Sequence, residues 1–181
     1  MYSIWLLPDR ITTERFQKII EALSEMHQSP QFLPHITLLA GIESIDDTHF
    51  YKLSVLAALT QVFDVTVGEL CQTNDYFKAL YLNIDTNETL QNLQSEIASV
   101  FLDVKYEFLP HLSLLYKHLN DEQLQFNQLQ TQLSNIFQAR NIVVVKAAGK
   151  VEDWKVIDAF QLHHKDDINT DELMLNLNLT N

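Results

Sequence analysis

Two eight-residue segments of nearly identical sequence constrain this chain more than any other feature. Residues 32–39 read FLPHITLL and residues 108–115 read FLPHLSLL, so the copies differ by one apolar exchange and one exchange of Thr for Ser. The second copy begins 76 residues after the first. This separation allows each copy to lie in its own half of a single domain, which predicts one site built from two matching halves.

Each copy has the pattern of a short buried strand. A strand sends alternate side chains to opposite faces, so His35 and Thr37 share one face and Ile36 takes the other. The second copy places His111 and Ser113 together in the same way. Side chains two residues apart on a strand are roughly 6 to 7 Å apart along its axis. An imidazole and a hydroxyl so placed can therefore contact the same tetrahedral anion.

The size and charge of the chain limit what it binds. It has 181 residues, of which 46% are hydrophobic, enough for the core of one domain. Its formal net charge is −12, from 24 acidic and 12 basic residues. Long nucleic acid requires a basic surface, so we expect no long nucleic acid as a partner. A small anion remains a candidate, because a local group of donors binds it whatever the overall charge.

Cysteine content and hydropathy indicate a cellular setting. Cys71 is the single cysteine, which excludes an internal disulfide and favours a reducing, cytoplasmic location. The apolar run near the N-terminus is too short for a signal sequence, and no stretch has the length of a membrane span. We therefore expect no membrane partner. We also expect a monomer.

Hydrophobic periodicity predicts an alternation of strands and helices. We expect strands over residues 2–7, 34–40, 62–70, 79–84, 110–116, 142–147 and 155–162. Helices are expected from Thr12, over residues 46–59 and 86–101, and from Asn120. The apolar face of that fourth helix would consist of Leu124, Leu129, Leu133, Ile136 and Phe137.

The order of these elements predicts an α+β fold in which two similar halves form one bilobal domain. The domain spans residues 1–164, with halves of about 1–75 and 76–164, because neither half alone buries enough surface. Residues 165–181 form a C-terminal tail that begins acidic and then alternates leucine with other residues. An edge strand, a segment that docks on a partner and a loosely ordered tail all fit this pattern.

Two facing strands of this kind would place two imidazoles and two hydroxyls around one cleft. One histidine can accept a proton from water while the other protonates a leaving oxygen, and the unperturbed pKa near 6.5 leaves both forms of histidine accessible. Thr37 and Ser113 would donate to phosphate oxygens, where negative charge develops. A single such motif is more often structural, but its repetition in the same context favours catalysis on a phosphodiester.

Other candidate ligands are weaker. The three glycines, Gly41, Gly68 and Gly149, are too scattered for a glycine-rich phosphate loop. Neighbouring histidines at His163 and His164, followed by Asp166 and Asp167, suggest a metal site only weakly, because ligands so close in sequence rarely converge on one ion. We expect neither a metal nor another cofactor.

The repeated motif resembles that of the two-histidine (2H) phosphoesterases, which carry two His-x-Thr/Ser-x-apolar motifs. The resemblance is closer to the plant and yeast cyclic phosphodiesterase branch, on the N-terminal segment YSIWLLP, on Tyr116 after the second motif and on Trp154 before the last strand. It spans residues 2 to 162. It implies a bilobal fold in which antiparallel sheets line a central cleft and helices lie outside.

The same resemblance implies an activity and roles for individual residues. The activity is metal-free hydrolysis of nucleoside 2′,3′-cyclic phosphates to 2′-phosphates, and of ADP-ribose 1″,2″-cyclic phosphate to ADP-ribose 1″-phosphate, after RNA cleavage or tRNA splicing. His35 and His111 would be the acid and base, with the resemblance favouring His111 as the base. Thr37, Ser113 and Tyr116 would contact phosphate, and Trp5 would contact base or ribose. The paired cysteines of plant relatives have no counterpart here.

Two rival functions stay open at this stage. One keeps the site and changes the substrate to an RNA end or a 2′,5′-linked oligonucleotide. The other is a non-catalytic module that binds cyclic phosphates or a protein. Tyr116 also poses a geometric question, because it lies five residues after His111. That odd offset points it away from the cleft on a regular strand, so the resemblance requires a bend or a strand end there.

Overall fold

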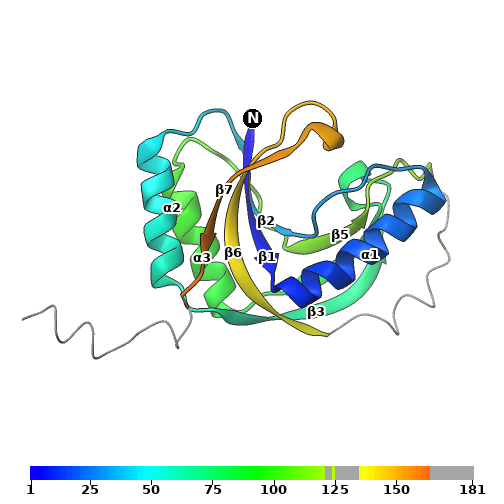
Figure 1. Ribbon diagram of the computed structural model, residues 1–181, viewed down its shortest axis with the longest axis horizontal. Helices are drawn as coiled ribbons and strands as arrows, with labels where there is room; N and C mark the ends of the chain where they lie inside the picture. Colours follow the sequence, from blue (N-terminus) through cyan, green and yellow to red (C-terminus); the bar gives the residue numbers. More distant parts are fainter. Residues whose placement is uncertain (121–123, 125–134, 164–181) are drawn as a thin grey trace, which may run out of the picture.

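Seven antiparallel strands form the framework of the protein (Figure 1). The computed structural model describes residues 1–120, 124 and 135–163. The strands are β1 (Tyr2–Pro8), β2 (Ile36–Ile42), β3 (Phe63–Gln72), β4 (Leu80–Asp85), β5 (His111–Leu115), β6 (Ile136–Lys146) and β7 (Lys155–Gln161). The helices are α1 (Arg10–His27), α2 (Asp47–Leu59) and α3 (Glu88–Val100), with 3₁₀ turns η1 (Tyr76–Lys78) and η3 (Val151–Asp153).

The order of the strands brings the two motif copies together. The sheet runs β1-β2-β5-β4-β3-β6-β7, and β1 also pairs with β6. Six strands therefore close into a ring, with β7 added to the outside of β6. The long strand β6 makes this closure possible, because its first residues pair with β3 and residues 139–146 pair with β1. The motif strands β2 and β5 are neighbours in this ring.

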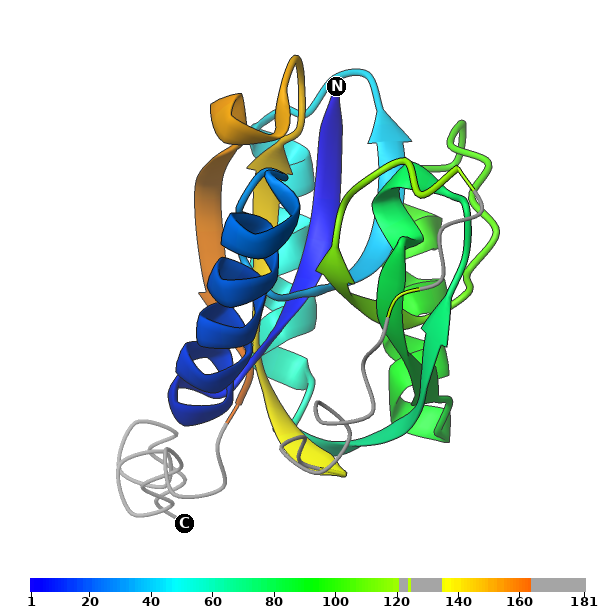
Figure 2. The same ribbon diagram turned by 90° about the vertical axis from the view of Figure 1, so that its right-hand side faces the viewer.

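The helices bind the two halves to each other. Helix α1 follows β1 in sequence but packs against β5, the motif strand of the second half. Helix α3 belongs to the second half and packs against β2, the motif strand of the first. Helices α2 and α3 contact each other and lie on the opposite side of the molecule from α1 (Figures 1 and 2). Each half thus covers the other half's motif strand.

Short polar side chains begin the helices. Asp9 accepts a hydrogen bond from the backbone N–H of Thr12, so α1 begins at Arg10, two residues before the expected start. At α2, Asp46 accepts from the backbone N–H of His49 in a capping box, at the expected position. The predicted strands agree with β1, β2, β3, β4, β5 and β7 apart from shifts of a few residues at their ends.

One predicted element is wrong in the part that the structure describes. Ile136 and Phe137 were expected on the apolar face of a fourth helix, but they begin strand β6. Ile136 is 54% exposed and Phe137 is buried, which is the two-residue alternation of a strand rather than a helical stripe. Pairing with Val65 and Thr66 of β3 fixes this conformation. The rest of that helix falls on residues 121–134, of which only Leu124 is described, and the tail at 165–181 also lies outside the described residues.

The two faces of the motif strands differ in the kind of side chain they carry rather than in burial, because His35 and Ser113 are only 6% and 4% exposed. Ile36 and Leu38 of β2 are fully buried in the core, as are Leu112 and Leu114 of β5. A helix with the length and hydropathy of a membrane span is absent from the described part of the chain.

Substitution of Phe16 tests how much the packing of α1 contributes to the free energy of unfolding. Its ring is fully buried and meets Phe137 of β6 edge-on, with ring centroids 6.2 Å apart. We expect Phe16→Ala to lower the free energy of unfolding by about 3 to 5 kcal/mol, because it removes a buried ring and leaves a cavity. Urea denaturation measures this loss.

The matched control is Ile11→Ala on the same helix, because Ile11 is 67% exposed. Its expected effect is below about 0.5 kcal/mol. Equal effects of the two substitutions would contradict the packing described above.

Candidate active site

The pairing of β2 with β5 places the two histidines and two hydroxyls in one site. Ile36 lies opposite Leu112 in an antiparallel register. Since the neighbours run in opposite directions, Thr37 comes next to His111 and Ser113 comes next to His35. The two motif copies are thus related by a pseudo-two-fold axis between Ile36 and Leu112. This arrangement brings the repeated residues onto one surface, as the sequence predicts.

Each imidazole is held by the same backbone contact. Nδ1 of His35 lies 2.6 Å from the carbonyl oxygen of Leu33, and Nδ1 of His111 lies 2.7 Å from that of Leu109. A carbonyl only accepts, so each Nδ1 carries a proton and donates it. The neutral tautomer therefore leaves Nε2 as the free basic nitrogen of both rings. This is the state required of a general base, and protonation of Nε2 makes either ring an acid.

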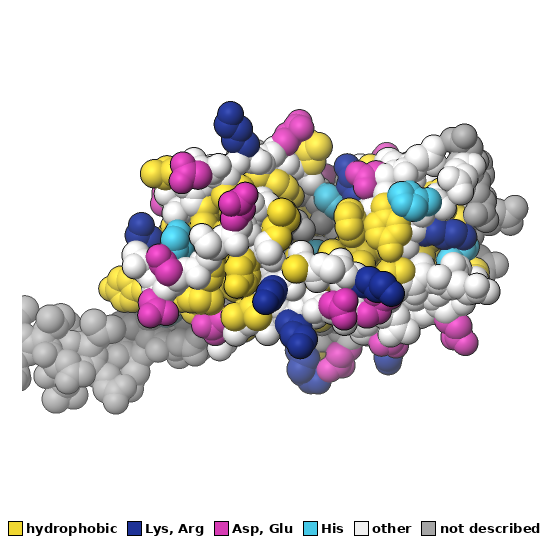
Figure 3. All heavy atoms as spheres, turned by 90° about the horizontal axis from the view of Figure 1, so that it is seen from above, with side chains coloured by type: hydrophobic (Ala, Val, Ile, Leu, Met, Phe, Trp, Pro, Cys, Tyr) yellow, Lys and Arg dark blue, Asp and Glu magenta, His cyan; other side chains and the backbone are white. Residues whose placement is uncertain are grey.

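These residues line a cleft of about 390 Å³. A volume of this order is typical of pockets for small ligands. Seen from above, the surface is hollowed between the two ends of the molecule, with hydrophobic side chains around the hollow (Figure 3). All of the predicted site residues contribute to its lining: Trp5, His35, Thr37, His111, Ser113 and Tyr116.

Tyr116 reaches the cleft because β5 ends one residue before it. The strand stops at Leu115, so the alternation that would turn Tyr116 away no longer applies. Its ring stacks on Phe32 with centroids 3.6 Å apart, and the side chain is 3% exposed. Burial raises the pKa of Tyr116 well above its usual value, so its hydroxyl stays protonated at neutral pH.

Trp5 lines the cleft but offers little free surface. It is 4% exposed, and its indole is stacked on the imidazole of His35 with centroids 3.6 Å apart and an angle of 8° between planes. Trp154 lies beside it, with ring centroids 5.8 Å apart. A more exposed aromatic surface at the cleft is Phe77 of η1, which is 47% exposed.

The two hydroxyl residues differ in their hydrogen bonds. Ser113 donates through Oγ to the carbonyl oxygen of Phe77, at 2.7 Å. This bond ties β5 to η1, which forms one wall of the cleft. Thr37 instead is contacted through its backbone carbonyl, which accepts a long hydrogen bond of 3.5 Å from the hydroxyl of Tyr106.

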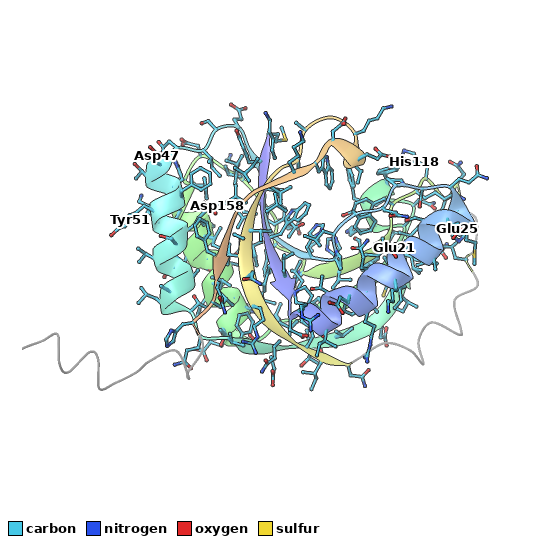
Figure 4. The ribbon with its side chains drawn as sticks, in the orientation of Figure 1. Glu21, Glu25, Asp47, Tyr51, His118 and Asp158 are labelled. Atoms are coloured by element: carbon cyan, nitrogen blue, oxygen red, sulfur yellow. The ribbon has the colours of Figure 1, made fainter. Side chains whose placement is uncertain are left out.

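Few charged side chains surround the histidines. Among the described residues, Asp75 and Lys78 are the charged side chains that line the cleft. Exposed acidic residues lie on outer surfaces instead: Figure 4 labels Glu21, Glu25, Asp47 and Asp158 there, and it shows His118 outside the cleft as well. The described lining of the cleft itself has one acidic and one basic side chain, so the net charge of −12 is not concentrated there.

Burial controls the protonation of both histidines. Removal from water lowers the pKa of His35 to about 4, with a smaller contribution from the nearby His111. Burial also lowers the pKa of His111, where Lys78 acts in the same direction and Asp75 opposes it. Both rings are therefore neutral at pH 7 in the free protein.

Sequence reasoning missed several residues that line the cleft. Phe77, Asp75 and Tyr106 were not singled out, because they lie in loops and turns that periodicity does not place. Their positions depend on how η1 and the segment before the second motif fold over β4 and β5. Within the described residues, no group of three or more His, Cys, Asp or Glu side chains converges on a point that could hold a metal ion; His164, Asp166 and Asp167 lie outside them.

Comparison with known proteins agrees with this geometry. The family model described as cyclic phosphodiesterase-like protein matches residues 1–162. The chain belongs to the cyclic phosphodiesterase-like family. The resemblance to two-histidine phosphoesterases is thereby confirmed, and the chain is a phosphodiester hydrolase. The match leaves out residues 163–181, which include the tail.

Two curated proteins of this family are similar to the chain. A cyclic phosphodiesterase of Arabidopsis thaliana is 27% identical over 124 residues, which cover 68% of each chain. A 2′,3′-cyclic-nucleotide 3′-phosphodiesterase of Kluyveromyces lactis is 23% identical over 214 residues, covering 89% of this chain and 98% of the relative.

Solved structures confirm the fold. The protein TT0787 of Thermus thermophilus superimposes with a TM-score of 0.63 at 14% identity, covering 91% of this chain and 98% of that one. LigT of E. coli complexed with 3′-AMP gives a TM-score of 0.58 at 16% identity, covering 89% and 96%. The predicted α+β fold with antiparallel strands is therefore correct.

The lowered pKa of His35 has a measurable effect on stability. A buried imidazole that resists protonation leaves stability unchanged above pH 6.5, where both folded and unfolded forms are neutral. As the pH falls from 6.5 to about 4, the unfolded chain gains a proton that the folded protein does not. We expect this group to remove roughly 3 kcal/mol of stability over that interval.

The measurement compares the wild type with His35→Gln by urea denaturation between pH 7 and pH 4. Carboxylates titrate in both proteins, so their contribution cancels in the difference. The wild type should lose stability faster than the variant as the pH falls. Parallel pH profiles would show that His35 is not held neutral by burial.

Proposed function

We propose that this protein hydrolyses small cyclic phosphodiesters, namely nucleoside 2′,3′-cyclic phosphates to 2′-phosphates and ADP-ribose 1″,2″-cyclic phosphate to ADP-ribose 1″-phosphate. The observation that carries the proposal is the pair of imidazoles, each fixed through Nδ1 to a backbone carbonyl and each with Nε2 left for chemistry. The relatives in Arabidopsis thaliana and Kluyveromyces lactis support this substrate class by their names.

The reaction divides between the two histidines. One Nε2 removes a proton from water, whose oxygen attacks phosphorus from the side opposite the bond to the 3′ oxygen. That bond breaks, and Nε2–H of the other histidine protonates the departing oxygen. The products are a 2′-phosphate and a free 3′-hydroxyl. Exchange with solvent then returns the base to its neutral form, and the acid takes up a proton again when the next substrate binds, so a metal is not required.

Access to water favours His111 as the base, which leaves His35 as the acid. His35 is 6% exposed and lies under Trp5, whereas His111 is more open to the water that must be activated. An anionic phosphate raises the pKa of both rings, and its effect is strongest where water is excluded. In the empty cleft the pKa of His35 is about 4. Substrate binding therefore raises this pKa, so that His35 can carry the proton that an acid donates.

Phosphate oxygens would be bound by side chains. Thr37 and Ser113 come from the two motif copies, and Tyr116 adds a protonated hydroxyl. Ser113 can donate to phosphate only by leaving the carbonyl of Phe77, since a hydroxyl has one proton to donate. Occupation of the phosphate site is thus linked to the position of η1.

The remainder of the substrate would lie along the aromatic rim. Phe77 is the most accessible ring of the cleft and takes the base in this proposal. Trp5 contacts the ribose at its edge, because one face of its indole is covered by His35. Lys78 attracts the anion toward the phosphate site.

Incubation with 2′,3′-cyclic AMP and with ADP-ribose 1″,2″-cyclic phosphate in EDTA tests the function. We expect hydrolysis of at least one substrate to the product named above, identified by chromatography. His35→Ala and His111→Ala should each reduce kcat by about 10² to 10⁴-fold, with the double variant hardly worse.

A matched control is His118→Ala, because His118 lies outside the cleft and should leave kcat unchanged. Absence of turnover on both substrates would refute the proposed activity. Turnover that EDTA abolishes would refute the metal-free mechanism, and binding without turnover would favour a non-catalytic module.

The pH dependence of kcat/KM provides a separate check. This ratio reports the pKa values of the free enzyme, and burial lowers those of both histidines below 6.5. We therefore expect a bell-shaped profile whose maximum lies on the acid side of pH 6.5. A monotonic profile would contradict a paired acid and base.

A further inference from the structure

The two histidines have different aromatic neighbours at matching positions. In the first half, Trp5 of β1 pairs with Thr37 of β2. In the second half, Tyr81 of β4 pairs with Ser113 of β5. Trp5 and Tyr81 therefore occupy equivalent places beside the two motif strands, and each ring lies next to the histidine of its own half.

The geometry of the two ring pairs is not equivalent. The indole of Trp5 is parallel to the imidazole of His35, at 3.6 Å between centroids and 8° between planes. The phenol of Tyr81 stands nearly perpendicular to the imidazole of His111, at 5.6 Å and 79°. Trp5 thus offers a stacked aromatic face to His35, whereas Tyr81, at the equivalent position, offers none to His111.

A stacked indole affects the protonated imidazole more than the neutral one. The face of an aromatic ring is electron-rich and attracts a cation, and tryptophan does so most strongly. The attraction increases where water is excluded, as it is around His35. The stack therefore acts against the burial that disfavours the imidazolium, and it also fixes the plane of the ring.

Buried contacts hold the indole in this orientation. Nε1 of Trp5 donates to Oγ of Ser3 at 2.8 Å, and that hydroxyl donates to the carbonyl oxygen of Leu39 at 3.0 Å. Ser3 is 4% exposed. Trp154 lies against the same indole and limits its movement. The hydrogen-bonded pair Ser3 and Trp5 thus connects the backbone of β2 to the imidazole of His35.

We propose that Ser3 and Trp5 are positioning residues for His35, which hold the imidazole by a fixed stacked face and stabilise the imidazolium that forms during turnover. The catalytic consequence rests on the proposed function, in which His35 is the acid. The effect on protonation does not, because it concerns the protein without substrate. Among the described residues no ring stacks on His111 in this way, which suits the base.

Other titratable groups line the same cleft as His35. They are the N-terminal amine of Met1 and the side chains of Tyr2, Asp75, Lys78, Tyr106, His111 and Tyr116. Among them, His111 contributes directly to the lowered pKa of His35. The substitutions of Trp5 and Ser3 below leave these groups unchanged, and the control position Tyr81 lies outside the set, beside His111.

NMR titration of the imidazole resonances tests the proposal without any substrate. The proteins compared are the wild type, Trp5→Phe, Trp5→Leu, Ser3→Ala and Ser3→Thr, each with and without sulfate, an anion whose charge is constant over the titration. We expect Trp5→Leu to lower the pKa of His35 by about one pH unit. Trp5→Phe and Ser3→Ala should lower it by less, and Ser3→Thr should restore it.

Tyr81→Leu is the matched control, because it removes the ring at the equivalent position of the other half. It should leave the pKa of His35 unchanged. Tryptophan fluorescence gives a second readout, since a protonated imidazole quenches an indole stacked on it. As the pH falls through the pKa of His35, the fluorescence of the wild type should decrease. His35→Gln should not show this transition.

An unchanged or raised pKa of His35 in Trp5→Leu would overturn the proposal. If the pKa of His35 is at its wild-type value in Ser3→Ala but lowered in Trp5→Leu, Ser3 is not a positioning residue. With 2′,3′-cyclic AMP, Trp5→Phe should reduce kcat about tenfold and leave KM within twofold. If the wild type fails to hydrolyse cyclic phosphates, the proposed function fails while the titration still decides the role of Trp5.

Discussion

The pairing of Ile36 with Leu112 is the contact on which the rest of the site depends. It joins the two motif strands at their pseudo-two-fold axis and sets the register that brings each histidine next to the hydroxyl residue of the other copy. A shift of one residue would turn every side chain of a strand to its other face. The fully buried residues Ile36, Leu38, Leu112 and Leu114 make such a shift costly.

The surrounding fold holds this register in place from outside. Because α1 packs on the second motif strand and α3 on the first, neither strand can move without disturbing the helix of the other half. The ring closed by β1 and β6 prevents the two halves from separating. A frame of this kind suits the proposed reaction, in which two imidazoles act on opposite sides of one phosphorus atom.

The sequence was sufficient for the features that repeat. The histidines, the hydroxyls and the buried leucines followed from two-residue alternation in a duplicated motif, and the strand end at Leu115 explains how Tyr116 reaches the cleft. Periodicity failed at Ile136 and Phe137, because an apolar pair fits a helix and a strand equally well until a partner strand is known. It also gave no position for Phe77 or Tyr106, whose contacts depend on the folding of loops.

The asymmetry between the halves explains how a duplicated motif can divide two tasks. Identical backbone contacts give both imidazoles the same tautomer, while the stacked indole, the engaged Ser113 and the unequal burial distinguish them. Duplication supplies the reacting groups, and the neighbouring strands supply their differences. In the proposed reaction, these differences favour one orientation of an unsymmetrical substrate.

In the proposed mechanism, one phosphate contacts both histidines at once. Imidazole nitrogen NMR during titration with 2′-AMP, the expected product, tests for this shared contact. We expect the Nε2 resonances of His35 and His111 to shift together, with one dissociation constant and one ligand per chain. Shifts confined to one histidine, or two different dissociation constants, would contradict it.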